Sequence, residues 1–327
     1  MPEPIISVRD LSVRYRTKES VVYAAEGVSF DLHRGKVLAL VGESGAGKTT
    51  AGMSVLRLLP PEAEILSGEV LFEGANLAAM DERSLRAIRG RRIAMIFQDP
   101  VAGLNPVLTI GNQVAEMLTS HLDIKKKEAQ QRARQILDDV GLADSERVAK
   151  AYPFQLSGGM CQRVMIGIAT ALNPDVIIAD EPTSALDVTI QAQILHQLAE
   201  LRDQKGTAIL LITHNFGVVA QLADEVGVMY AGRIVERGDV VSMLKAPLHP
   251  YTHALLSTLP RIDGAYSQLR SIPGHPPELT EPAEHCPFLP RCQKALTLCR
   301  TEPPPPLITD DTRTHPVACY NPVWRSD

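Results

Sequence analysis

The residues GESGAGKTT, from Gly42 to Thr50, decide the fold. They match the pattern G-x-x-x-x-G-K-[ST] without a gap, between a predicted strand, KVLALVG at 36–42, and a predicted helix. Glycines let such a loop turn its N–H groups toward phosphate oxygens, while Lys48 reaches the β and γ phosphates and the Thr49 hydroxyl ligates Mg²⁺. A plain glycine turn before a helix is the alternative, and the strand–loop–helix context favours a phosphate loop. The expected nucleotide-binding residues are Gly42, Glu43, Ser44, Gly45, Ala46, Gly47, Lys48, Thr49 and Thr50.

Buried strands and helices alternate along the first three quarters of the chain. The runs RRIAMIFQ, DVIIADE and TAILLIT, at 91–98, 175–181 and 207–213, are typical of buried strands, so we expect an α/β domain with a mainly parallel sheet. Between them, VAEMLTSHL and KEAQQRARQILDDVGL place apolar residues at helical intervals. This pattern predicts a helical subdomain, at about residues 100–170, inserted into the sheet domain.

Two carboxylates, Asp180 and Glu181, end one of the apolar runs. Charges at the end of a buried strand are costly unless they are used. Asp180 suits a Mg²⁺ shell, and Glu181 suits the polarisation of a water that attacks the γ phosphate. The alternative is an acidic strand end that caps the next turn.

Composition limits the class of protein. The 327 residues are 45% hydrophobic, enough for a sizeable core, and the net charge of -5 gives no overall basic field for nucleic acid or anionic lipid. The first residues, MPEPIISVRD, lack a signal-peptide pattern, and no apolar run approaches the length of a spanning helix. We therefore expect a cytosolic protein with reduced thiols.

The last part of the chain differs in composition. Residues 246–327 hold 15 of the 24 prolines, so this segment is expected to be mostly irregular. It also holds four of the five cysteines, Cys286, Cys292, Cys299 and Cys319, spaced C-x5-C-x6-C-x19-C. Four thiolates could hold zinc or an iron–sulfur cluster. Structural zinc sites use closer cysteine pairs, so the wide spacing favours [4Fe–4S] over Zn²⁺ and over an unligated or disulfide-bonded quartet. His285 and His315 are alternative ligands, but a lone histidine there is more often part of a polar loop.

Further motifs complete an ordered set. LSGGMCQRV at 156–164 could by itself be an ordinary helix N-cap. Together with Gln98 in FQDP, SALD at 184–187 and His214 in LITHN, it resembles the ATP-binding subunits of ABC transporters, over residues from about 5 to 240.

The resemblance implies a head-to-tail dimer of ATPases. Each ATP would lie between one phosphate loop and the other subunit's Ser157, Gly158 and Gly159, at a helix N-terminus that attracts phosphate. By position, Gln98 would sense Mg²⁺ and the attacking water, so that Thr49, Gln98 and Asp180 form the Mg²⁺ site. The catalytic residues would be Glu181, His214, Gln98 and Lys48, with His214 at the γ phosphate and Asp187 acting across the dimer. Tyr15 falls where the family stacks an aromatic ring on adenine, and its alternative is a simple edge-strand aromatic.

Two positions depart from the family pattern. Many relatives have arginine where this chain has Cys161, and aspartate where it has Asn215. Neither change removes a group with an assigned chemical role, so we expect hydrolysis to survive. Cys161 itself is expected to be a small packed residue.

The kind of ABC protein follows from what surrounds the motor. Only 57 residues, 99–155, separate the glutamine loop from the signature, too few for the coiled coil of repair-type relatives, and only one motor set is present. The segments APLHPYTHALLSTLP at 246–260, IPGHPPEL, CPFLPRC and VACY resemble the tail of ATPases from oligopeptide, dipeptide and nickel importers. Some of these ATPases are thought to carry [4Fe–4S] in this tail. In this chain the cluster would be a structural staple, or a sensor that turns uptake off when oxidised.

We therefore expect the ATPase of a bacterial importer for di- or oligopeptides, made of an ABC domain at 1–245 and an importer-type extension at 246–327. A nickel, metallophore or opine importer, or a soluble ABC ATPase acting on nucleic acid or ribosomes, are the alternatives. The implied cofactors are ATP, Mg²⁺ and the cluster. The implied partners are a second ATPase subunit, paralogous or identical, two permease subunits and an extracytoplasmic binding protein, with no nucleic acid. The chain would then lie on the cytoplasmic face of the bacterial inner membrane.

Overall fold

The computed structural model describes residues 3–18, 20–184, 186–258, 272–307 and 315–323. It divides into two compact units. Unit 1 comprises Met1–Leu32, Val37–Ala78 and Ile212–Asp327, and unit 2 comprises His33–Lys36 and Ala79–Leu211. None of the helices within the described ranges combines the length and the apolar character needed to cross a lipid bilayer.

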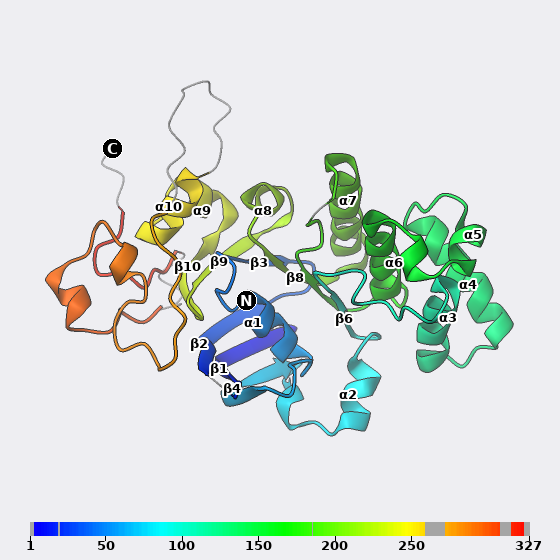
Figure 1. Cartoon of the computed structure of the whole chain (residues 1–327), viewed down its shortest axis with the longest axis horizontal. Helices are drawn as coiled ribbons and strands as arrows, with labels where there is room; N and C mark the ends of the chain where they lie inside the picture. The colour runs from blue at the N-terminus through cyan, green and yellow to red at the C-terminus, as the bar shows by residue number, and fades with distance from the viewer. Residues whose placement is uncertain (1–2, 19, 185, 259–271, 308–314, 324–327) are drawn as a thin grey trace. The chain divides into compact units, whose positions relative to one another are not determined.

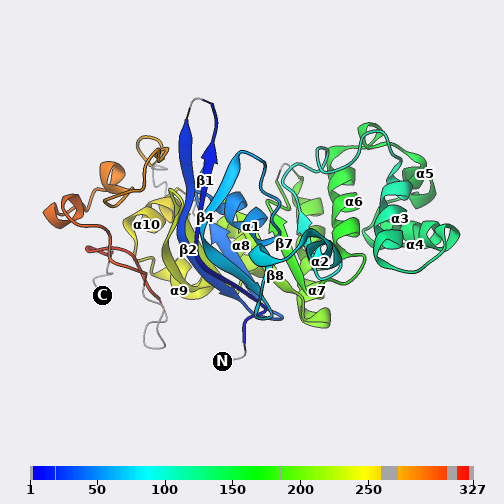
Figure 2. The same ribbon diagram turned by 90° about the horizontal axis from the view of Figure 1, so that it is seen from below.

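Unit 1 contains an antiparallel sheet of strand order β2-β1-β4-β5. Its strands are β1 (Ile6–Arg16), β2 (Val21–Leu32), β4 (Ala63–Phe72) and β5 (Ala75–Asn76). The long strands β1 and β2 run side by side in both views, and α1 (Lys48–Val55) contacts β1, β2 and β4 (Figures 1 and 2). Sequence patterning predicts the parallel strands and does not reveal this sheet.

The parallel strand of unit 1 is β3 (Val37–Val41), whose five residues are all buried, as the run KVLALVG predicts. It pairs in parallel with β9 (Glu225–Tyr230), and β9 pairs in antiparallel with β10 (Arg233–Asp239). The short helices α8 (Phe216–Leu222) and α9 (Val240–Lys245) complete this part of the unit.

The proline-rich end of the chain packs on unit 1 with little regular structure. It has one α-helix, α10 (Pro250–Ser257), and two 3-10 turns, η3 (Leu289–Arg291) and η4 (Thr297–Arg300), among its described residues. Residues 316–318 lie along β10, with Arg237 N–H donating to Pro316 O at 3.0 Å and Ala318 N–H donating to Val235 O at 2.8 Å. The final described segment, red in Figure 1, therefore covers the edge of β10. Residues 259 and 260 of the importer-like segment 246–260 lie outside the described residues.

Unit 2 pairs β6 (Ile93–Ile96) in parallel with β7 (Val176–Asp180), both fully buried. Its helices are α2 (Glu82–Ile88), α3 (Ile110–His121), α4 (Lys126–Asp139), α5 (Ser145–Lys150), α6 (Gly158–Thr170) and α7 (Val188–Lys205), with the 3-10 turn η2 (Pro153–Gln155) before α6. Helices α3 to α6 lie side by side in both views (Figures 1 and 2). The helical patterns at 114–122 and 127–142 fall in α3 and α4. The buried strand β8 (Ala208–Thr213) begins in unit 2 and ends in unit 1.

Candidate functional site

The phosphate loop of unit 1 follows β3 directly and leads into α1, as the sequence predicts. Two of its glycines are required by space as well as by conformation. Gly42 (φ +155°) and Gly47 (φ +93°) have backbone angles that side chains rarely adopt, and a Cβ would lie 2.2 Å from Met229 O and 2.0 Å from Ala24 O respectively. The loop is thus packed against β9 and β2 without room for a side chain at either position.

Lys48 is the buried cation of this loop, with 8% of its surface exposed. Its Nζ donates to Gly42 O at 2.8 Å and to Glu43 O at 2.9 Å, so the ammonium lies against the loop backbone. Helix α1 begins at Lys48 with no side-chain cap, and a helix N-terminus of this kind attracts anions. Thr49 follows Lys48 and is half-buried.

Tyr15 lies on the central strand of the antiparallel sheet, opposite Val22 on β2 and Ala63 on β4. The alternative of an edge-strand aromatic is therefore wrong, because β1 has a partner on both sides. The Tyr15 hydroxyl is 3.2 Å from Thr50 Oγ1, which places its half-buried ring beside the phosphate loop. Its predicted stacking on adenine stays a prediction.

His214 is exposed at the end of β8, beside Asn215, which begins α8. The Asn215 side chain accepts a hydrogen bond from Gly217 N–H at 2.9 Å and so caps the helix. Because asparagine and aspartate are equally good N-caps, the departure at position 215 keeps this local structure.

In unit 2, the carboxyl ends of β6 and β7 lie at one sheet edge, since Ile96 pairs with Ala179 in a parallel register. Asp180 (2% exposed) is the last residue of β7, Glu181 (8% exposed) follows it directly, and exposed Gln98 follows β6 by two residues. Glu181 has φ +47°, a left-handed conformation that is unusual for a residue with a side chain. The structure therefore brings these three predicted residues to the same edge of the sheet.

The signature segment of unit 2 forms an exposed, capped helix start. Ser157 Oγ accepts a hydrogen bond from Met160 N–H at 3.3 Å, and α6 begins at Gly158, where a Cβ would meet open space. Gln162 fixes this helix to the turn after Glu181, with Nε2 donating to Pro182 O at 2.8 Å. Asp187 in turn caps α7, accepting from Ile190 N–H at 2.9 Å.

Cys161 is fully buried in α6, and its thiol donates to Pro153 O at 3.6 Å. Burial raises the pKa of this thiol, so it stays protonated and unreactive at neutral pH. The prediction of a small packed residue is confirmed.

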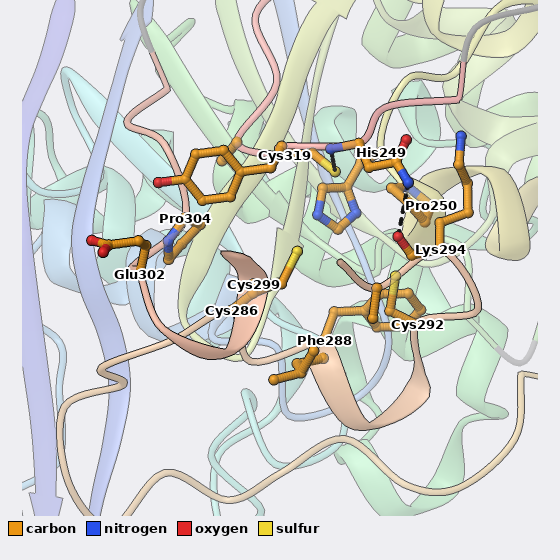
Figure 3. A pocket seen from close by; sticks show the side chains of 15 residues that line it. His249, Pro250, Cys286, Phe288, Cys292, Lys294, Cys299, Glu302, Pro304 and Cys319 are labelled. Carbon is orange, nitrogen blue, oxygen red and sulfur yellow. Dashed lines mark hydrogen bonds between the residues drawn. The ribbon is translucent and has the colours of Figure 1, made fainter. Parts of the chain in front are cut away.

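The other four cysteines line one pocket in the C-terminal part of unit 1, together with His249 and Phe288 (Figure 3). The pocket encloses about 410 Å³ of space between atoms, part of it open to solvent. All four are free thiols. Burial raises the pKa of Cys286 and Cys292, and it raises that of Cys319 to about 11. Neighbouring thiols add to each of these increases, after burial.

The cysteine pocket does not have the geometry of a site for one metal ion. In the part of the chain that the structure describes, no group of three or more His, Cys, Asp or Glu side chains is arranged to hold an ion. His285 does not line the pocket, and His315 Nε2 is 2.7 Å from the fully buried Glu236 Oε1. The structure thus favours the interpretation of both histidines as parts of the polar loops.

Sequence reasoning misses the residues that hold Glu43 in the phosphate loop. The Glu43 carboxylate accepts two hydrogen bonds from Arg291, and Glu43 N–H donates to Tyr251 Oη at 2.9 Å. Arg291 belongs to the quoted segment CPFLPRC, yet no local pattern indicates a partner 248 residues away.

A strand–loop–helix phosphate site, together with a capped LSGG helix and paired carboxylates at a strand end, defines the class of ATP-hydrolysing P-loop proteins. Two family models match the chain: ABC transporter at residues 25–184, and Oligopeptide/dipeptide transporter, C-terminal region, at residues 235–299. The chain belongs to the ABC transporter family, among its ATP-binding proteins.

Known proteins resemble the chain over nearly its whole length. A probable peptide ABC transporter ATP-binding protein of Sinorhizobium fredii is 47% identical over 99% of this chain and 95% of its own. The dipeptide transport ATP-binding protein DppD of Bacillus subtilis is 44% identical over 97% of this chain and 95% of its own. Among solved structures, a dimeric ATP-binding cassette in a post-hydrolysis state with ADP and Pi has a TM-score of 0.65 at 27% identity, over 72% of this chain and 98% of its own.

These similarities confirm the α/β ABC ATPase fold and the resemblance found in the sequence. The chain is an ATP-hydrolysing subunit of an ABC transporter, and ATP with Mg²⁺ are the cofactors expected of such an enzyme.

Proposed function

We propose that this chain drives the import of di- or oligopeptides into a bacterial cell. The observation that carries the proposal is the combination of one ABC motor, at 25–184, with the C-terminal region found in oligopeptide and dipeptide transporters, at 235–299. The relatives are named as peptide and dipeptide transport proteins, which supports the same class of ligand.

The proposed reaction is hydrolysis of MgATP by an in-line water. The loop from Gly42 to Thr50 would bind the phosphates, with Tyr15 on the adenine and Thr49, Gln98 and Asp180 around Mg²⁺. Glu181 would orient and polarise the attacking water, and His214 would contact the γ phosphate. The buried position of Glu181 at a strand end supports this role, because water exclusion strengthens its interaction with the reacting groups.

We propose that two such ATPases close on ATP in a head-to-tail dimer, with Ser157, Gly158, Gly159 and Asp187 acting on the partner's nucleotide. The open N-terminus of α6 supports this proposal, since exposed N–H groups at a helix start attract phosphate. The second ATPase would be a paralogue or an identical chain. Two permease subunits and an extracytoplasmic binding protein would complete the importer at the inner membrane, with this chain on the cytoplasmic face.

The proposed organisation is an ABC domain at 1–245, with the helices α3 to α6 as its inserted helical subdomain, followed by an importer-type extension at 246–327. The extension would contact the motor through α10 and residues 315–323, which lie along unit 1.

Isolation of the native complex tests the proposal. The tagged chain is purified from detergent-solubilised membranes of its source, its partners are identified, and the complex is reconstituted in liposomes with ATP on the side of the motor. ATP-dependent uptake of labelled di- and oligopeptides, lost in a Glu181→Gln complex, is the expected result. Uptake of nickel but not of peptides would show that the importer carries nickel instead of peptides. Ribosomes or DNA as the only partners would refute the proposal that the chain belongs to an importer.

We also propose that Cys286, Cys292, Cys299 and Cys319 hold a [4Fe–4S] cluster as a structural staple. The support is that four unpaired thiols from separate loops line one pocket in a segment with little regular structure. A cluster is larger than a single ion, so its ligand sulfurs stand farther apart than those of a zinc site. When bound, it would cross-link these loops.

Anaerobic purification tests the cluster. Broad absorbance at about 400 nm with about four irons and four sulfides per chain is the expected result. One zinc per chain without colour, or neither metal, would refute it while leaving the motor unaffected.

A further inference from the structure

Every polar group of Glu43 in the phosphate loop is engaged. Its carbonyl accepts from Lys48 Nζ at 2.9 Å, its N–H donates to Tyr251 Oη at 2.9 Å, and its two carboxylate oxygens accept from Arg291 at 2.7 and 3.0 Å. The carbonyl also accepts from Ala46 N–H at 3.2 Å within the loop. The partners of the N–H and of the carboxylate, Tyr251 and Arg291, both belong to the C-terminal part of the chain.

Arg291 is held in place from several sides. Only 5% of its side chain is exposed, Nε donates to Pro273 O at 2.8 Å, and Nη1 donates to Tyr230 Oη at 3.2 Å. The guanidinium carbon also lies 5.8 Å from the centre of the Tyr230 ring and 6.0 Å from that of Phe288. Breaking a bidentate pair this buried costs more than breaking an exposed ion pair, because removing one partner leaves the other as a desolvated charge.

Tyr251, which accepts the hydrogen bond from Glu43 N–H, is also held in place by packing. Tyr251 is fully buried in α10, and its ring packs on Tyr230 and Phe288 with centroid distances of 4.5 and 5.4 Å. Burial raises the pKa of the Tyr251 hydroxyl, which therefore stays neutral and accepts the Glu43 N–H bond.

The turn that carries Arg291 is bounded by two pocket cysteines. Leu289 N–H donates to Cys286 O at 3.0 Å, and Cys292 N–H donates to Leu289 O at 3.3 Å. Backbone hydrogen bonds therefore connect the turn η3 to both cysteines. A change in the conformation of the cysteine pocket would therefore also move the backbone that carries Arg291.

We propose that Arg291 is a positioning residue for the phosphate loop: through Glu43 it holds residues 42–47 in the conformation that receives nucleotide phosphates, and so couples the C-terminal part of the chain to nucleotide affinity. This inference rests on the nucleotide site proposed above. Arg291 touches no substrate in this arrangement and acts through Glu43 alone.

The test is a double-mutant cycle on the full-length protein, with MgADP as the probe in isothermal titration calorimetry. Arg291→Met keeps the apolar stem and removes the charge, and we expect it to weaken MgADP binding about tenfold. Arg291→Lys should recover part of this loss, because it keeps the charge without the bidentate geometry. The double variant Glu43→Gln/Arg291→Met should bind no more weakly than Glu43→Gln alone, since Arg291 acts only through Glu43.

The matched control is Arg237→Met. Arg237 pairs with Glu225 at 2.9 Å on β10 and β9 of the same unit and does not contact the loop, so its loss should leave the affinity within about twofold of the original protein. Tyr251→Phe, which removes only the acceptor of the Glu43 N–H bond, serves as a second probe if Arg291→Met fails to fold. Hydrogen exchange at the amides of residues 42–47 should be faster in both probe variants and unchanged in the control.

Unchanged MgADP affinity and unchanged exchange in a folded Arg291→Met protein would overturn the inference. Additive losses in the double variant would also overturn it, because Arg291 would then act by another route. Failure of the original protein to bind MgADP would instead remove the proposed nucleotide site, and the inference with it.

Discussion

Glu181 is the residue proposed to polarise the attacking water, and its position can be tested directly. It is buried, it directly follows a fully buried strand, and it has φ +47°, a conformation that costs about 1–3 kcal/mol and persists only when the surroundings impose it. We predict that Glu181→Gln lowers the ATP hydrolysis rate by about 10²–10⁴-fold while MgATP still binds, because the amide keeps the shape and loses the base. Phosphate release and nucleotide binding are measured on the same sample.

The control for this substitution is Glu200→Gln, at an exposed position of α7 where the side chain is 49% exposed. It should hydrolyse ATP at the original rate. A Glu181→Gln protein that keeps more than about a tenth of its activity would assign the base to another residue.

His249 is a buried residue whose titration affects stability. It is fully buried beside the Glu236 carboxylate, and burial lowers its pKa from 6.5 to about 4. Between these two values the unfolded chain binds a proton that the folded chain does not, so stability falls as the pH falls from about 6.5 to 4, by up to about 3 kcal/mol. Above pH 6.5 the titration of His249 makes no contribution to the pH dependence of stability.

We predict that His249→Asn flattens the dependence of the unfolding free energy on pH between 4 and 6.5. Asparagine can still accept the N-cap bond that Tyr251 N–H donates to His249 Nδ1 at 3.1 Å, and it does not titrate. Urea denaturation at several pH values measures the slope, and His196→Asn, at a site 75% exposed, is the control that should not change it. An unaltered slope in His249→Asn would assign the acid sensitivity to other groups.

At the scale of the element, the phosphate loop offers a matched pair of glycines. Gly47 and Gly45 both have positive φ, +93° and +80°, but a Cβ at Gly47 would lie 2.0 Å from Ala24 O, whereas a Cβ at Gly45 would meet nothing within 4 Å. We predict that Gly47→Ala abolishes MgADP binding, because the loop must leave β2, and that Gly45→Ala, which adds only conformational strain, weakens binding far less. Titration calorimetry on both variants checks this, and equal losses would mean that strain, not contact, controls the loop.

The elements also show what the sequence can predict. Continuous apolar runs predict β3, β6, β7 and β8, because parallel strands buried on both faces need apolar residues at every position. The antiparallel strands β1 and β2 escape this reasoning, since register shifts between Val8 and Leu11, Leu11 and Val13, and Val13 and Arg14 break the alternation of inward and outward side chains.

The candidate site divides in the same way. The phosphate loop and the strand-end carboxylates are local patterns of a few residues that spacing predicts, whereas LSGG by itself indicates only a helix N-cap and takes its role from the family resemblance. The contact of Arg291 and Tyr251 with Glu43 depends on tertiary packing between segments that are more than 200 residues apart, and neither residue type signals its partner.

At the scale of the whole molecule, an aromatic cluster joins the C-terminal part to the rest of unit 1. Phe288, 2% exposed, packs on Tyr230 of β9, Tyr251 of α10 and His249, with ring centroids 5.2, 5.4 and 5.9 Å away. We predict that Phe288→Ala lowers the free energy of unfolding by about 3–5 kcal/mol and exposes residues 272–307 to protease. Leu298→Ala, at a side chain 43% exposed, should change neither. Denaturation curves with limited proteolysis check both, and a loss below about 1 kcal/mol for Phe288→Ala would mean that the cluster does not anchor this segment.

The pairing of Glu43 with Arg291 also has a consequence for how the protein is made. The two residues are 248 positions apart, so at about 5–20 residues per second the ribosome adds Arg291 roughly 12 to 50 s after Glu43. During that interval the nascent chain carries a phosphate loop without the residue that holds it. On the role proposed for Arg291, a product of premature termination before residue 291 would bind ATP more weakly than the full chain does.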